Sequence, residues 1–452
     1  LALMGLAADV QHRVPGTEVR IVESSLDCPT DEAWERLLRS YQPDLIGLRS
    51  INFFVDEVRR LVEGAARLGP TPVILGGPIA TALGAKVFDS VSALQFAAAG
   101  DGESVLRAAA SGVPLAEIPG VLWRGPLGVR RNGEAEPPAE LDALPFPDYS
   151  LVSLERYASQ LSYAYNQRRQ GVLLTSRGCP YRCSYCFQPY GQRVRLRSAR
   201  NVLEEIEQLA SRHGVADFYV VDDIFNVHRQ RAMEVFDGLI AARLGVRLYF
   251  VNGLRIDRCD RAFVDRMVEA GTVWVTYAIE SAHPRIQALI RKELDLKLAH
   301  EVISYTQAAG IVVNVNTMFG FPTETAAEAQ VTLDWLGTLP RPSLLPYHFN
   351  LRGFPGCDIV EQAVEAGWDR EAFLASGGSS YNDLPPGSPT FSRKEMLEHW
   401  LRYHERFGMQ SRSHLRTSVE TLRRIGYSDV ELVDMYSVLL NRALGSVSEL
   451  LG

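Results

Sequence analysis

Short apolar runs alternate with helical patterns in two separate series along this 452-residue chain, and that alternation is typical of α/β folds. The first series gives expected helices at Asp31–Arg39, Phe54–Leu68 and Thr81–Asp89 and expected strands at Glu18–Val22, Asp44–Leu48, Pro72–Leu75 and Leu94–Ala98. It predicts a parallel, doubly wound sheet over residues 1–112. Because the pattern opens on a helix, we expect a strand before Leu1.

The second series starts at Gly171 and contains six strand–helix units. Its expected strands are Val172–Thr175, Phe218–Val221, Leu248–Val251, Val273–Ala278, Ile311–Met318 and Tyr347–Leu351. Six such units predict a partial (β/α)₆ barrel over residues 171–384, with its chemistry at the carboxyl ends of the strands.

Two further segments complete the predicted organisation. Residues 113–170 are rich in proline and predict a linker between the two α/β domains. Residues 385–452 carry capping patterns that begin at Ser392, Thr417 and Ser428, and they predict a helical C-terminal domain. We interpret that domain as a lid or a packing element.

Three of the six cysteines, Cys179, Cys183 and Cys186, fall within eight residues directly after the first expected barrel strand. This distribution is typical of metal ligands and not of a disulfide framework. Three thiolates on a tight loop can hold three irons of a cubane and leave the fourth iron open. Structural zinc normally has four protein ligands, and no fourth cysteine or histidine is near in sequence. We therefore expect an iron–sulfur cluster.

The Cys-x₃-Cys-x₂-Cys spacing, with an aromatic residue before the last cysteine, resembles the radical S-adenosylmethionine superfamily. The resemblance implies a [4Fe–4S] cluster on these cysteines, with S-adenosylmethionine on its open iron. It also implies cosubstrate contacts from Asp222 or Asp223 after the second barrel strand, and from Arg255, Glu280 and Ser281 after the third and fourth. A surface salt bridge is the alternative role for the arginine.

Glycine-containing turns follow two strands of the first domain, at residues 76–77 and 100–103. Such turns let backbone N–H groups approach a phosphate or another polar group, although they also occur for geometry alone. Upstream of this barrel they resemble the cobalamin-binding domain of the superfamily's largest subgroup, a Rossmann-like fold. The resemblance implies that cobalamin contacts Gly76, Gly77, Thr81, Gly100, Gly102 and Glu103.

The first domain lacks the Asp-x-His-x-x-Gly loop with which many cobalamin domains ligate cobalt, and His12 is the only histidine before His213. We therefore expect cobalt without a protein imidazole. Arg49, in the loop expected under the corrin at residues 48–53, could stand at the lower face and disfavour a sixth ligand. A charged guanidinium cannot itself ligate a metal. An ion pair with a carboxylate is the alternative role for Arg49.

The resemblance implies a methyltransferase that moves a methyl group from S-adenosylmethionine through methylcobalamin to a carbon of a small molecule, in natural-product (antibiotic) biosynthesis. It implies an external low-potential electron donor such as flavodoxin or ferredoxin. Ring formation or oxidation by a cobalamin-containing relative is the alternative, and a non-catalytic cobalamin or cluster sensor is a third reading. Methylthiolation needs a second cysteine set in the N-terminal domain, where only Cys28 occurs.

Tyr277 and His348 lie on expected barrel strands and are acid–base candidates, with packing as the alternative for each. The net charge of −7 and the absence of a lysine or arginine block argue against nucleic acid as a partner. The sequence has no apolar run long enough to span a membrane and no visible signal peptide. We therefore expect a cytoplasmic protein with no membrane partner.

Overall fold

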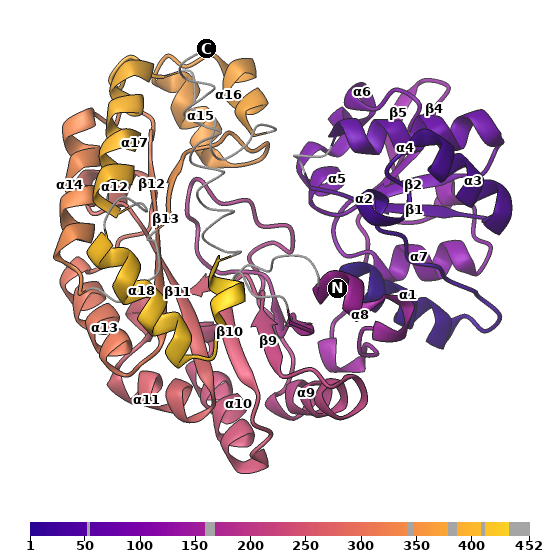
Figure 1. Ribbon diagram of the computed structural model, residues 1–452. Helices are drawn as coiled ribbons and strands as arrows, with labels where there is room; N and C mark the ends of the chain where they lie inside the picture. The colour runs from indigo at the N-terminus through magenta and orange to yellow at the C-terminus, as the bar shows by residue number, and fades with distance from the viewer. Residues whose placement is uncertain (52–54, 159–167, 341–346, 378–386, 408–411, 434–452) are drawn as a thin grey trace. The chain divides into compact units, whose positions relative to one another are not determined.

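The computed structural model describes residues 1–51, 55–158, 168–340, 347–377, 387–407 and 412–433 (Figure 1). The chain divides into two compact units, each treated by itself below. Unit 1 contains Leu1–Ser153, Phe187–Arg195 and Phe354–Gly356, and unit 2 contains Leu154–Cys186, Leu196–Gly353 and Cys357–Gly452.

Unit 1 is built around a five-stranded sheet in the order β1-β2-β3-β4-β5. The first three strands are parallel, as predicted, and the last two are antiparallel. The strands are β1 (Ile46–Arg49), β2 (Val73–Gly76), β3 (Phe96–Ala98), β4 (Val121–Gly125) and β5 (Gly128–Arg131). The helices are α1 (Ala2–Arg13), α2 (Ser24–Asp27), α3 (Asp31–Tyr41), α4 (Val55–Leu68), α5 (Pro78–Leu83), α6 (Val87–Ser90) and α7 (Glu103–Ala110).

The structure differs from the predicted unit 1 in three places. Residues 18–22 form no strand, because no described strand pairs with them, although their exposure alternates as in one. The helix expected over residues 81–89 is split into α5 and α6, since Gly84 takes the left-handed conformation with φ at 52°. The segment predicted as a linker supplies β4 and β5, which extend the sheet as a hairpin.

The core of unit 1 lies between α3, α4 and the sheet. Trp34, Leu61 and Leu75 belong to one buried cluster, and the Trp34 indole donates a hydrogen bond of 2.9 Å to the Leu61 carbonyl. Gly64 of α4 faces that indole so closely that an added Cβ would lie 2.7 Å from the Trp34 ring. This contact sets the distance between the two helices.

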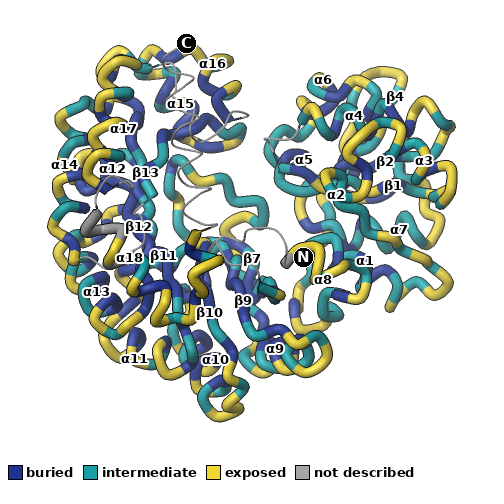
Figure 2. The backbone as a smooth tube through the Cα atoms, viewed as in Figure 1, coloured by how far each residue is buried: buried dark blue, intermediate teal, exposed yellow. Residues whose placement is uncertain are grey.

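Unit 2 contains a six-stranded parallel sheet in the order β6-β9-β10-β11-β12-β13, and all six predicted barrel strands are confirmed. The strands are β6 (Gln170–Leu173), β9 (Asp217–Val220), β10 (Arg247–Leu254), β11 (Thr272–Glu280), β12 (Val312–Phe319) and β13 (Tyr347–Asn350). The strands are largely buried, and the exposed residues concentrate on the helices (Figure 2).

Most helices of unit 2 line the outer face of this sheet or follow it in sequence, whereas α8 precedes it (Figure 1). They are α8 (Leu154–Ala158), α9 (Ala199–His213), α10 (Arg229–Ala242), α11 (Arg261–Glu269), α12 (Pro284–Leu289), α13 (Leu296–Ala308), α14 (Ala326–Thr338), α15 (Asp358–Glu365), α16 (Arg370–Ser376), α17 (Arg393–Phe407) and α18 (Arg412–Arg424). Two further two-residue strands are β7 (Ser176–Arg177) and β8 (Arg195–Leu196).

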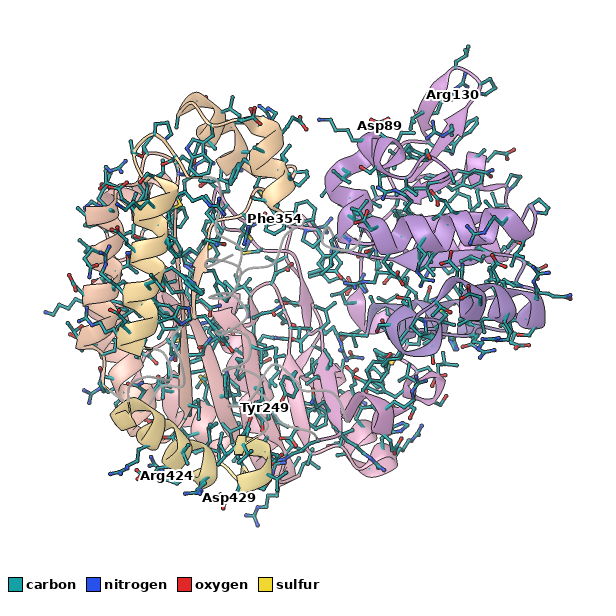
Figure 3. The ribbon with its side chains drawn as sticks, turned by 45° about the horizontal axis from the view of Figure 1, so that its top comes forward. Asp89, Arg130, Tyr249, Phe354, Arg424 and Asp429 are labelled. Atoms are coloured by element: carbon teal, nitrogen blue, oxygen red, sulfur yellow. The ribbon has the colours of Figure 1, made fainter. Side chains whose placement is uncertain are left out.

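The C-terminal helices pack on the barrel. Leu422, Tyr427 and Leu432 share one buried cluster with aromatic residues of the barrel strands, including Tyr249 and Trp274. Figure 3 shows Tyr249 near the segment between α18 and the end of the described chain. The packing role predicted for this domain therefore describes α18, while residues 434–452 lie outside the described part.

The predicted helix starts are confirmed at two of three positions. Glu395 accepts from Ser392, and Glu431 accepts from Ser428, in reciprocal capping contacts. Thr417 lies inside α18, so no helix begins there. The amphipathic pattern of α18 continues through Thr417, so this capping motif lies within the helix and does not begin one.

Candidate functional site

The loop that carries the three cysteines is fixed at its start by Asp222. Its carboxylate accepts hydrogen bonds from the Thr175 backbone N–H (2.5 Å), the Thr175 hydroxyl (2.5 Å) and the Ser176 hydroxyl (2.7 Å). Asp222 is only 2% exposed. Of the two predicted carboxylates, Asp222 therefore holds the entry to the loop and is already occupied by these donors.

Asp223 is partly exposed, and one of its oxygens accepts from the Gly178 backbone N–H at 3.0 Å, directly before Cys179. Burial raises the pKa of Asp223, and the neighbouring Asp222 raises it further. Burial likewise raises the pKa of the Cys179 thiol, to which Asp223 also contributes. Asp223 is thus the predicted carboxylate that lies beside the cysteine loop.

The three thiols lie close enough to oppose one another's ionisation. Burial raises the pKa of the Cys186 thiol to about 12, with further contributions from Cys183 and Cys179, although Cys186 as a whole residue is exposed. A cationic group bound among the thiols would reverse this shift, because coordination deprotonates thiols. The donor set therefore suits an iron–sulfur cluster.

In the described part of the chain, no three histidine, cysteine or acidic side chains are gathered as they would be around one metal ion. A cubane makes a different demand, since each cysteine binds its own iron. The relevant feature is three thiols on one loop after the first barrel strand, as the sequence predicted.

Arg255 follows β10 and lies over the same loop. Its guanidinium carbon is 3.9 Å from the centroid of the Tyr181 ring, and Nη2 donates to the Lys292 carbonyl at 2.9 Å. Nε forms an ion pair of 2.9 Å with Asp257, so Arg255 also makes a salt bridge, the alternative role considered for it. The side chain is 11% exposed, which makes it part of the site wall and not a surface ion pair.

Tyr185, in the cysteine loop, meets a buried ion pair that the sequence did not reveal. Its hydroxyl donates to Glu280 Oε1 at 2.9 Å, and the Lys292 ammonium donates to both the Tyr185 oxygen (3.0 Å) and Glu280 Oε1 (2.9 Å). Glu280 is 6% exposed and Lys292 is 7% exposed. Glu280, predicted as a cosubstrate contact, is thus tied to the cysteine loop itself.

The other predicted barrel residues have packing contacts. Ser281 is fully buried, and its hydroxyl accepts from the His283 N–H (3.1 Å) next to Thr332 of α14. The Tyr277 hydroxyl lies 3.1 Å from the Thr306 hydroxyl of α13. For Tyr277 this contact agrees with the packing alternative, while the role of Ser281 as a cosubstrate contact stays a prediction.

His348 also contacts the outer helix layer. Its ring nitrogens lie 2.8 Å from the Thr317 hydroxyl and 2.8 Å from His399 of α17. Burial lowers its pKa well below the usual value, so the ring is neutral. For His348, as for Tyr277, the structure gives the packing role and no contact with the cysteine loop.

In unit 1 the predicted glycine turns are joined by Thr81. Its hydroxyl donates to the Gly77 carbonyl (3.1 Å) and accepts from the Gly100 N–H (3.0 Å). Gly77 has φ at 86°, and an added Cβ would lie 2.9 Å from the Arg49 side chain. Close approach between the ends of β1 and β2 therefore requires glycine at position 77.

The remaining predicted cobalamin contacts lie at the same edge of the sheet. Gly76 ends β2, Gly102 precedes α7, and Glu103 is its buried first residue. Arg49 ends β1 and is exposed. Residues 52 and 53 of the loop expected under the corrin lie outside the described residues.

A cavity of about 290 Å³ opens beside these turns, wholly within unit 1. Its walls include Thr81 and Gly100 of the predicted set together with Tyr190 and Arg193, which follow Cys186 in sequence. Asp101 and Arg195 form a buried ion pair of 2.9 Å in its wall. A cavity with glycine turns and charged walls suits the polar tail of a large cofactor.

The sequence profile of the Radical SAM superfamily matches residues 173–336, from the first barrel strand into α14. Relatives include the uncharacterized methyltransferase PH0819 of Pyrococcus horikoshii, which is 24% identical over 70% of this chain and 69% of its own length. Cytidylyl-2-hydroxyethylphosphonate methyltransferase of Streptomyces wedmorensis is 27% identical over 68% of this chain and 64% of its own. Anaerobic magnesium-protoporphyrin IX monomethyl ester cyclase of Rubrivivax gelatinosus is 26% identical over 71% of this chain and 59% of its own length.

Two solved structures share the fold. The radical S-adenosylmethionine methyltransferase TsrM from Kitasatospora setae, with cobalamin and a [4Fe–4S] cluster bound, has a TM-score of 0.65 at 20% identity, over 79% of this chain and 72% of TsrM. The cobalamin-dependent S-adenosylmethionine radical enzyme OxsB has a TM-score of 0.64 at 17% identity, over 99% of this chain and 69% of OxsB. The predicted fold class is confirmed. Separately, no described helix combines the length and the apolar character needed to cross a membrane.

Proposed function

We propose that this chain, whose residues 173–336 belong to the radical S-adenosylmethionine superfamily, is a cobalamin-dependent C-methyltransferase acting on a small molecule. One observation carries the proposal. A three-cysteine loop after the first strand of a partial barrel occurs together with an α/β unit whose strand-end turns border a cavity. The fold shared with TsrM and the similarity to methyltransferases support it.

When bound, the cluster would supply a low-potential electron, S-adenosylmethionine the methyl group, and cobalamin the carrier of that group. Cys179, Cys183 and Cys186 would hold three of its irons as thiolates. Asp223, beside the loop and only singly bonded to Gly178, is the carboxylate suited to an ammonium group. Arg255 lies over the loop, where its guanidinium suits a carboxylate.

In unit 1, Thr81 holds the two glycine turns together, and the cavity beside them would receive the polar tail of the corrinoid. Arg49 presents a permanent positive charge at the end of β1. Because no histidine occurs between His12 and His213, we propose that cobalt has no protein imidazole ligand. A charged guanidinium at the lower face of the corrin would disfavour a sixth ligand on cobalt.

The substrate and the biological setting are also proposals. Two of the similar proteins are named methyltransferases, and one acts on a cytidylylated phosphonate. We propose a small-molecule substrate in natural-product biosynthesis and an external flavodoxin or ferredoxin as electron donor. The surface carries no long lysine or arginine block that would favour nucleic acid.

Ring formation is the second candidate function, because one relative at 26% identity is a magnesium-protoporphyrin ester cyclase. Mass spectrometry separates the two. Anaerobically reconstituted protein is incubated with deuteromethyl-labelled S-adenosylmethionine, a low-potential reductant and a panel of small molecules. A product that gains the labelled methyl group supports methyl transfer, while a product that loses hydrogen without gaining methyl supports the cyclase-like reaction.

A further inference from the structure

We propose that Lys292 is a positioning residue for the cysteine loop and that, with Glu280 and Tyr185, it sets the charge beside Cys186 and so the reduction potential of the cluster. This inference rests on the proposed function, because it assumes a cluster on the three cysteines. It adds a residue from outside the cysteine motif, on the segment between α12 and α13.

Lys292 contacts the cysteine loop in two ways. Its ammonium donates to the Tyr185 hydroxyl, one residue before Cys186. Its backbone carbonyl accepts from Arg255, whose guanidinium lies 3.9 Å from the ring centroid of Tyr181. Lys292 therefore contacts Tyr185 directly and is linked to Tyr181 through Arg255.

The charges are buried and matched. Glu280 and Lys292 are each less than 10% exposed, and Glu280 Oε1 accepts from both Lys292 and Tyr185. The Tyr185 hydroxyl that contacts both charged groups belongs to the residue directly before Cys186. Removing one of these two charges leaves the other unpaired in a poorly solvated place beside the cluster.

The backbone is held in an uncommon conformation at the same place. Glu280 has φ at 68°, and the two neighbours of Lys292, Arg291 and Glu293, have φ at 55° and 50°. Non-glycine residues persist in this left-handed region when surrounding contacts determine them, and such residues gather at functional sites. The contacts at this place include the Lys292–Glu280 ion pair and the Gln287 side chain, whose Oε1 accepts from the Leu294 N–H at 3.2 Å.

Arg291 offers a matched control. It neighbours Lys292 and is a cation on the same strained segment, but it pairs with Asp358 at 2.6 Å, where both side chains are about half exposed or more. Replacing it removes one positive charge from the segment without touching Tyr185 or Glu280. Solvent screens an exposed pair of this kind.

The test is a redox titration of the full chain, reconstituted anaerobically and followed by electron paramagnetic resonance of the reduced cluster. The variants are E280Q, K292M, E280Q/K292M and the control R291M. E280Q is compared with the unmodified chain and R291M at mildly acidic pH, so that an unpaired ammonium stays protonated, and K292M is compared with them at alkaline pH, so that an unpaired carboxyl stays ionised. Iron and sulfide are quantified in each variant. Absence of a [4Fe–4S] signal in the unmodified chain would defeat the proposed function, independently of the redox result.

We expect opposite shifts in the two single variants. E280Q leaves a positive charge unpaired and raises the potential, whereas K292M leaves a negative charge unpaired and lowers it. At fixed applied potential, each changes the ratio of reduced to oxidised cluster on the order of tenfold, as expected for a unit charge in a poorly solvated place at an effective dielectric constant of about 20. The double variant and R291M should stay near the unmodified chain.

Shifts in the same direction for both single variants, or shifts no larger than that of R291M, would overturn the proposal. If either single variant fails to retain iron, Tyr185→Phe supplies the test, because it removes one donor to Glu280 and keeps the ring. We expect a more negative potential for Y185F than for R291M. An unchanged potential in Y185F with full iron content would overturn the proposal.

Discussion

The two ends of the barrel are built from the same six strands but from different residue types. Toward the amino ends of the strands, Tyr219, Tyr249 and Trp274 form a largely apolar layer with Leu422 and neighbouring residues of the C-terminal segment. The charged groups there are a paired set, since the buried Asp217 carboxylate accepts from Arg247 and from the Tyr249 hydroxyl. The rings of Tyr219 and Tyr249 stack with centroids 4.6 Å apart. This end has the close packing typical of a stabilising core.

The carboxyl ends of the same strands carry charged groups and strained backbone. Asp222 and Asp223 follow β9, Arg255 follows β10, and Glu280 ends β11 in a left-handed conformation. Lys292 and the cysteine loop complete this end. The difference indicates that one end of the barrel supports stability and the other supports chemistry, as in other parallel barrels.

Trp274→Ala tests the apolar end and has the largest expected effect on stability. Trp274 is 2% exposed, and truncation of a buried tryptophan costs roughly 3–5 kcal/mol of unfolding free energy. Denaturant unfolding measures the loss, and iron retained after reconstitution at low temperature shows that the other end is unaffected. Loss of iron binding without loss of stability would contradict the division between the two ends.

Asp222→Ala tests whether the charged end of the barrel depends on the hydrogen bonds that hold the start of the cysteine loop. The change removes the acceptor for three hydrogen bonds and leaves the buried Thr175 N–H without it, so we expect a loss of about 2–3 kcal/mol. The cysteine loop should become more susceptible to limited proteolysis near residue 176. A variant as stable and as protease-resistant as the unmodified chain would show that Asp222 does not anchor the loop.

The stability of the folded chain should fall in acid because of a buried histidine in the outer helix layer. Burial lowers the pKa of His399 to about 3, against an ordinary value of 6.5. Below pH 6.5 the unfolded chain takes up a proton that the folded chain excludes, so stability falls as the pH falls toward 3. Between pH 7 and pH 5 this costs about 2 kcal/mol.

His399→Leu should remove that part of the pH dependence, measured as the difference in unfolding free energy between pH 7 and pH 5. His348 is also buried with a lowered pKa and retains a share of the effect. Equal pH dependence in the variant and the unmodified chain would mean that folding does not lower the pKa of His399.

Asp223→Asn probes the chemical end with little cost in stability. Within the described part of the chain, Asp223 accepts a single backbone hydrogen bond, from Gly178, and an amide oxygen can accept the same bond. Loss of the charge should weaken binding of S-adenosylmethionine about tenfold, the effect of about 1.4 kcal/mol. Equilibrium binding to the reconstituted protein measures this, and unchanged affinity would remove Asp223 from the site.

Much of the fold could be predicted because parallel strands and their helices leave strong patterns in sequence. The six barrel strands and the cysteine loop follow from apolar runs and from cysteine spacing. The hairpin of β4 and β5 was missed because surrounding prolines obscured two short strands joined by Gly125 to Gly128. The strand expected at residues 18–22 has the right alternation but no described partner.

The site was harder to predict, because a barrel strand is buried on both faces and its sequence does not say which side chains face the interior. Tyr277 and His348 lie on correctly predicted strands yet contact α13 and α17. Lys292 lies far from the cysteine motif in sequence, and only the fold brings it to Tyr185. Charge pairs of this kind depend on tertiary contacts that no local pattern records.

The most direct test of the account is the iron and sulfide content of the anaerobically reconstituted chain, compared with a C179A/C183A/C186A variant. We predict about four irons and four sulfides per chain, and almost none in the triple variant. Cys28→Ala is the control, because Cys28 is fully buried in unit 1 and should leave the iron content unchanged. Stoichiometric zinc without iron in the unmodified chain, or iron retained by the triple variant, would contradict the account.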